Sequence, residues 1–155
     1  LGEAVSEEKG EAAQSADLDC LIDISVNAHI PESYVESLTL RLDVYRRIAD
    51  IRNKEDSLDV KDELKDRFGE IPESVLGLID IALIRNCANA MGIYEIRQTD
   101  TNVLLFVKEI KSPKVIELLS RLNGRAMLSA GNKPYITIRC GGGSSLDMLK
   151  KVFKI

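Results

Sequence analysis

The stretch that decides the fold lies at residues 57–92 and reads SLDVKDELKDRFGEIPESVLGLIDIALIRNCANAMG. Apolar residues recur three and four positions apart on both sides of Gly69, which is typical of two helices. Glycine is best suited to the left-handed position after a helix, and proline fits the first turn of the next helix. The sequence therefore predicts a short helix over residues 57–68, with Leu64 and Phe68 facing the core, and a long helix over residues 72–91, ended by Gly92.

The predicted helix over residues 72–91 is apolar on nearly every side, so we expect it to form the centre of the core. Its apolar residues are Val75, Leu76, Ile79, Ala82, Leu83, Cys87 and Met91. In this setting Cys87 is interpreted as a small buried hydrophobe and not as a nucleophile.

Upstream of residue 57 the sequence predicts one more helix and one strand. Ser37 is a suitable N-cap for a helix that runs to about residue 53. Its predicted inner face consists of Leu38, Leu42, Tyr45, Ile48 and Ala49. Apolar and polar residues alternate over residues 21–30, which is typical of a strand with one buried face. His29 occupies a polar position of this strand, so it is interpreted as a surface residue.

Downstream of Gly92 the pattern changes to paired strands. Strands are predicted at residues 93–98, 102–108, 125–130 and 135–140. A helix is expected over residues 113–122, and a last helix from Ser144 or Ser145 to the end, with Leu146, Leu149, Val152 and Phe153 inward. The order is a strand, three helices and then ββαββα. A small antiparallel sheet packed by helices makes the predicted class α+β.

The length, the hydrophobic content and the cysteine count of the chain favour one intracellular domain. Hydrophobic residues make up 45% of the 155 positions, which is enough for one core. Residues 1–17 are predicted to be the end of a preceding helix and a polar linker, with the domain at 18–155. Three scattered cysteines (Cys20, Cys87 and Cys140) indicate a reducing compartment, so a cytoplasmic location is expected. No apolar run approaches the length of about 18–20 residues that a membrane span needs.

The sequence contains no pattern typical of a catalytic or metal site. There is one histidine, Cys and His residues do not cluster, and no phosphate-binding loop with its lysine is present. The run Gly141–Gly143 precedes the last helix, whose free amides could hold a phosphate, but a flexible joint is the more ordinary interpretation. We therefore expect no enzyme activity and no cofactor.

An acidic stripe is the feature that helix formation alone does not explain. At 100° per residue, Asp59, Asp62, Glu63 and Asp66 fall within a sector of about 100°. Such neighbouring like charges oppose one another by about 0.2–0.5 kcal/mol per pair. Two interpretations stay open: a solvated face, softened by Arg67 four residues after Glu63, or a contact surface for an arginine-rich region of another domain.

The second half of the chain is basic, with twelve Lys or Arg against six Asp or Glu from residue 74 onward. A nucleic-acid-binding module is therefore the alternative function. Its candidate residues are Arg125, Lys133, Arg139, Lys150, Lys151 and Lys154. The signal is weak, because no recognition motif for nucleic acid is present.

Residues 30–93 resemble the C-terminal domain of bacterial transcription-repair coupling factors. The marks are an Ile-Pro at residues 30–31 with an aromatic residue three positions on, Leu-x-x-Tyr-Arg-Arg-Ile-Ala at residues 42–49, and Asp-Glu-Leu-x-Asp-Arg-Phe-Gly at residues 62–69 followed by Pro72. The closing Ala-x-x-x-Gly-Ile at residues 88–93 fits as well. The layout of the remaining elements extends the similarity to about residues 18–155, although Gly141–Gly143 departs from the family pattern.

This resemblance implies a regulatory domain of a longer ATP-driven DNA translocase that binds stalled RNA polymerase and recruits UvrA in nucleotide excision repair. It implies autoinhibition, in which the C-terminal domain packs on the UvrB-like module of the same protein in competition with UvrA. Carried over by position, the docking residues are Glu63 and Asp66, with Asp62 and Asp59 as weaker neighbours. Replacing Glu63 and Asp66 by arginine is then expected to abolish docking and to leave the fold intact.

Overall fold

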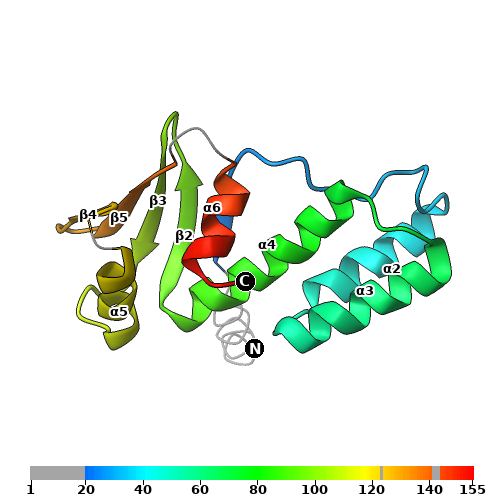
Figure 1. Ribbon diagram of the computed structural model, residues 1–155, viewed down its shortest axis with the longest axis horizontal. Coiled ribbons are helices and arrows are strands. Elements are labelled where there is room, and N and C mark those ends of the chain that lie inside the picture. The colour runs from blue at the N-terminus through cyan, green and yellow to red at the C-terminus, as the bar shows by residue number, and fades with distance from the viewer. Residues whose placement is uncertain (1–19, 123, 141–143) are drawn as a thin grey trace, which may run out of the picture. The chain divides into compact units, whose positions relative to one another are not determined.

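The computed structural model describes residues 20–122, 124–140 and 144–155 (Figure 1). These residues form two compact units. We call them the sheet unit, which is residues 20–23 with 88–139, and the helical unit, which is residues 24–87 with 140–155. The described chain holds five helices and one five-stranded sheet, which confirms the α+β class. The linker predicted at residues 1–17 and the run 141–143 lie outside the described residues.

The sheet unit has strand order β1-β2-β3-β5-β4. Its elements are β1 (Leu21–Asp23), β2 (Ile93–Gln98), β3 (Asn102–Val107), α5 (Pro113–Leu122), β4 (Ala126–Ser129) and β5 (Tyr135–Arg139). Four strands are antiparallel, as predicted, but β1 runs parallel to β2, so the sheet is mixed. Three helices separate β1 from β2 along the chain, and a connection of that length permits parallel pairing.

The first strand is much shorter than predicted. It ends at Asp23, because pairing with β2 covers only residues 21–23. Residues 24–30 still alternate between half-buried and exposed side chains and finish at buried Ile30, but they are not part of a strand. His29 is exposed, as predicted. The alternation thus predicted the burial correctly and the hydrogen-bonded ladder wrongly.

The helical unit contains α2 (Leu38–Ala49), α3 (Lys54–Phe68), most of α4 (Glu73–Ala90) and α6 (Ser145–Val152). Ser37 caps α2 as predicted, because its side chain accepts a hydrogen bond from the backbone N–H of Leu40. Asn53 caps α3 in the same way, with 2.8 Å from the backbone nitrogen of Asp56 to its Oδ1. Therefore α2 ends before residue 53, and α3 begins three residues before the predicted Ser57.

The buried face of α2 agrees with the predicted one at Ile48 alone. Val44 and Ile48 lie in the core, whereas Leu38 and Leu42 are exposed. Ala49 is exposed too, and Tyr45 is held at the surface by its hydroxyl, which accepts a hydrogen bond from the backbone N–H of Ile30 at 3.0 Å. An apolar stripe at helical spacing exists on both faces of α2, and packing within the unit decides which one is buried.

Helix α4 supplies much of the core, as predicted, through Val75, Ile79 and Ala82, all at most 1% exposed. Its end is marked by Gly92, whose φ is +79°. Gly69 ends α3 with φ +92° and ψ −159°, an extended conformation open to glycine alone and not the left-handed helical one predicted. Cys87 is half-buried and not fully buried, and this partial burial raises the pKa of its thiol.

The last helix begins at Ser145, as predicted, but ends at Val152 and not at residue 155. Ser144 caps α6, and its four predicted inward residues, Leu146, Leu149, Val152 and Phe153, are buried. Lys150 pairs with Asp80 at 3.1 Å, which joins α6 to α4 by charge as well as by packing. None of the described helices is long and apolar enough to cross a membrane.

Candidate functional site

Helix α3 carries the acidic stripe and is held firmly on its other side. Val60 and Leu64 are buried at 3% and 2% exposure, and Phe68 packs against the same core cluster. The ring of Phe68 also lies 5.7 Å from that of Tyr34, whose hydroxyl donates a hydrogen bond to the carbonyl of Gly69 at 3.0 Å. These contacts confirm the predicted inward face of α3, so the opposite face is presented by a rigid helix.

Glu63 is drawn into ion pairs within the unit. Its Oε1 accepts hydrogen bonds from Nε and Nη2 of Arg47 on α2, at 3.1 and 2.5 Å. Its Oε2 accepts one from Nη1 of Arg67 at 3.1 Å. The hydrogen bonds from Arg47, and then those from Arg67, hold the pKa of Glu63 below its ordinary value, and Glu63 in turn raises the pKa of Arg47. Glu63 therefore joins α2 to α3.

The other three acids of the stripe have different surroundings. Asp59, Asp62 and Asp66 are exposed, and none of them forms an ion pair with another residue in the described ranges. Asp59 is near enough to Arg47 to add to the rise in the pKa of that guanidinium. Asp62 and Asp66 thus present unneutralised carboxylates to solvent, which is the property that a contact with a basic partner requires.

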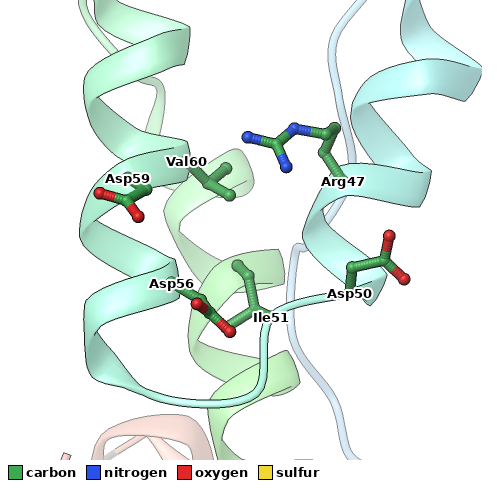
Figure 2. A pocket seen from close by; sticks show the side chains of 6 residues that line it. All are labelled: Arg47, Asp50, Ile51, Asp56, Asp59 and Val60. Carbon is green, nitrogen blue, oxygen red and sulfur yellow. The ribbon is translucent and has the colours of Figure 1, made fainter.

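A shallow hollow of about 170 Å³ opens between α2 and α3 (Figure 2). Arg47 reaches over it from α2, and Asp59 stands on its α3 side. The remaining lining residues are Asp50, Ile51, Asp56 and Val60. Asp56 is committed to capping contacts, since its carboxylate accepts a hydrogen bond from the backbone N–H of Arg52. Among the residues that the structure describes, no group of three or more His, Cys, Asp or Glu is arranged to hold a metal ion.

The structure therefore divides the predicted site residues into two sets. Asp62 and Asp66 stand free on the outer face, with Asp59 at its edge, and Glu63 is turned toward α2. Sequence reasoning found Arg67 as a partner of Glu63, because four residues along a helix are neighbours. It missed Arg47, which is sixteen residues away from Glu63 and comes close only when α2 and α3 pack. No local spacing rule could have found that pair.

We expect the Arg47–Glu63 pair to contribute a small and measurable coupling energy. The two side chains are 51% and 32% exposed, so a double-mutant cycle of Arg47→Gln and Glu63→Gln should give about 0.5–1 kcal/mol in the free energy of unfolding. The more exposed pair of Arg46 and Asp43, at 73% and 53%, is the matched control and should give less. Equal coupling in the two cycles would contradict a special role for Glu63 between the helices.

The same pair predicts a pH dependence. Because the folded-state pKa of Glu63 is lowered, its stabilisation is complete above the pKa of the unfolded state and is lost as the pH falls through the folded-state pKa. The difference in unfolding free energy between the native chain and Glu63→Gln should therefore shrink below the ordinary glutamate value of 4.5. Urea unfolding of both proteins at a series of pH values measures this, and a difference that grows toward acid pH would contradict it.

The fold and the acidic stripe together describe a class of protein: a small α+β domain whose candidate site is a charged helix face. Residues 24–117 match the family model described as the TRCF domain. That match covers more than half of the chain, so the chain belongs to the TRCF domain family. The resemblance to transcription-repair coupling factors inferred from the sequence is thereby confirmed.

Similar proteins agree with this assignment. The transcription-repair-coupling factor of Bacillus subtilis (strain 168) is 30% identical over 158 residues, which span 98% of this chain and 13% of that protein. The one of Mycobacterium tuberculosis (strain CDC 1551 / Oshkosh) is 38% identical over 78 residues, 50% of this chain and 6% of that protein. A crystal structure of a C-terminal domain of transcription-repair coupling factor shares the fold, with a TM-score of 0.76, 17% identity and coverage of 87% of this chain and 88% of that one.

Proposed function

We propose that this chain is a non-catalytic regulatory domain of a longer transcription-repair coupling factor. In this proposal it docks on the UvrB-like module of the same protein and masks the surface that UvrA needs. Membership of the TRCF domain family supports the proposal that the chain is part of a longer transcription-repair coupling factor. The observation that carries the proposal is the pair of exposed carboxylates, Asp62 and Asp66, which have no ion pair among the described residues and stand on a helix locked to the core by Leu64.

In this proposal, the residues that contact the partner differ from the residue that positions helix α3. Asp62 and Asp66 are available to arginines of a partner without breaking an existing pair. Glu63 would have to leave Arg47 first, and exchange of one guanidinium partner for another yields little net free energy. We therefore assign contact to Asp62 and Asp66, with Asp59 beside them, and assign to Glu63 the positioning of α3 against α2.

Such a contact suits a reversible mask. Exposed ion pairs are worth about 0–1 kcal/mol each and are screened by salt, so two of them specify orientation without binding permanently. Tethering in one chain raises the local concentration of the partner and compensates for weak affinity. A conformational change elsewhere in the longer protein could then release the domain.

The wider setting belongs to the same proposal. The chain spans 13% of the length of its Bacillus subtilis relative, so the ATP-driven translocation of DNA, the binding of RNA polymerase and the recruitment of UvrA are assigned to the longer protein. That protein is proposed to act in the cytoplasm. This domain needs no cofactor for a docking role.

The test is calorimetric titration of this domain with the isolated UvrB-like module at low and at moderate salt. Binding that weakens as salt rises supports the docking contact, because exposed charge pairs are screened. If the separate pieces do not bind, the two are joined by a flexible linker and the competition with UvrA is measured instead. UvrA binding to the joined protein as strong as to the module alone would contradict the mask.

A further inference from the structure

One face of the sheet carries an aromatic cluster that takes no part in the proposed docking contact. Tyr94 of β2, Phe106 of β3 and Tyr135 of β5 come from three neighbouring strands. The ring centroids of Tyr94 and Phe106 are 6.2 Å apart, and those of Phe106 and Tyr135 are 5.4 Å apart. All three side chains are only half-buried. The strands thus assemble a row of rings that is accessible to a ligand.

The pairing register shows that this face is the open one. Leu105 pairs with Ile136, and both are 0% exposed, so they lie on the covered face. Successive strand residues alternate between faces, so Phe106 and Tyr135 lie on the other side. Met127 of β4 belongs to that side too and is 71% exposed. The half-buried rings and Met127 thus give this face apolar side chains that a ligand can reach.

Positive charge surrounds the row of rings. Residues 88–139 hold eight Lys or Arg against four Asp or Glu, and residues 121–139 hold four bases and no acid. Arg125, Lys133 and Arg139 are exposed and form no ion pair with any described residue. Arg125 directly precedes β4 and Arg139 ends β5, and they lie at the same end of this strand pair, because Ala126 pairs with Ile138.

One more cation lies within the face itself. The guanidinium of Arg97 stands over the Phe106 ring, 5.3 Å from its centroid, and its side chain is 50% exposed. It also pairs with Glu95 at 2.6 Å, which neutralises an acid that would otherwise repel phosphate. The unneutralised bases are therefore toward β4 and β5, and the acids of the face are toward β1 and β2.

We propose that this face binds single-stranded nucleic acid. Bases stack on Phe106 and Tyr135, and backbone phosphates lie against Arg125 and Arg139. Rings on adjacent strands of an open antiparallel sheet accept any base, since every base has a flat π-face, and flanking cations follow the backbone. The proposal concerns the sheet unit and does not depend on the docking role of α3. It predicts little sequence preference, because no base-edge contact is needed for stacking.

The test is the fluorescence anisotropy of a labelled oligothymidylate of about 15 nucleotides, titrated with the whole chain at low salt and then at rising salt. Saturable binding is expected, with a logarithmic salt slope of about −0.7 for each phosphate contacted. Phe106→Leu and Tyr135→Leu keep apolar bulk and remove the ring, and each should weaken binding by about five- to tenfold. Arg125→Glu with Arg139→Glu should weaken it further and flatten the slope.

The matched control is Lys54→Glu with Lys65→Glu, which makes the same charge change at exposed positions of the helical unit and should alter affinity by less than about twofold. Circular dichroism establishes that each variant is folded. Undetectable binding at the lowest salt would overturn the proposal, and so would equal binding by the leucine variants. Displacement of the oligonucleotide by an equal charge of poly-glutamate would overturn it in favour of an acidic protein ligand.

Discussion

Replacing Asp62 and Asp66 together by arginine should weaken binding of the UvrB-like module by at least about 100-fold, a loss of about 2.7 kcal/mol. The change converts two attractions with a basic partner into two repulsions, and juxtaposed like charges at an interface cost several kcal/mol. Both residues are exposed and lack ion pairs among the described residues, so the fold loses no contact. Calorimetric titration at low salt measures the effect.

The control for this variant is Asp100→Arg with Glu109→Arg. It makes the same change in net charge at two exposed positions of the sheet unit and should leave docking unchanged. If both double variants lose binding equally, the contact depends on overall charge and not on α3. If neither loses binding, the assignment of the docking surface to Asp62 and Asp66 is wrong.

Glu63→Arg with Asp66→Arg, the pair that the family resemblance suggests, is the less selective test. A third guanidinium at position 63 would stand beside Arg47 and Arg67, which now share the Glu63 carboxylate. We therefore expect this variant to lose stability as well as docking. Asp66→Asn should reduce docking more than Glu63→Gln does, and calorimetry of the two neutral variants tests that order.

Ile48→Ala should lower the free energy of unfolding by about 2–5 kcal/mol. Ile48 is 4% exposed in the core of the helical unit, so truncation removes buried methyl groups and leaves a cavity. Leu42→Ala is the matched control on the same helix. Leu42 is 46% exposed, and its loss should cost no more than about 0.5 kcal/mol.

Urea or thermal unfolding of the two variants distinguishes the two possible faces of α2. The hydrophobic pattern alone assigned both residues to the inner face, which predicts comparable losses. A larger loss for Leu42→Ala than for Ile48→Ala would show that the helix is rotated relative to the structure. The observed arrangement predicts a clear difference in the opposite direction.

Much of the architecture could be predicted from local signals. Capping by Ser37, the stop at Gly92 and the bounds of β2 and α5 depend on residues within a few positions of one another. The predicted inward faces of α3 and α6 were also confirmed, because each of these helices has one apolar stripe. The stripe of acids on α3 could likewise be located from helical spacing alone.

Other features depend on which elements come together. The face of α2 that is buried could not be predicted, because apolar residues lie on two sides of that helix and only packing selects one. The same holds for the parallel pairing of β1, whose partner lies about seventy residues along the chain. Alternation of apolar and polar residues predicts which side chains are buried. It does not predict whether a neighbouring strand is present to form backbone hydrogen bonds.

The sequence by itself determined the class of the fold, the positions of most helices and strands, the acidic stripe of α3 and the family. Only the tertiary structure decided the role of each acid, because Arg47 reaches Glu63 from another helix and leaves Asp62 and Asp66 exposed. It alone assembled the aromatic face, since Phe106 and Tyr135 come from different strands. Local spacing determines how one element presents its residues, whereas long-range packing determines which residues of different elements meet.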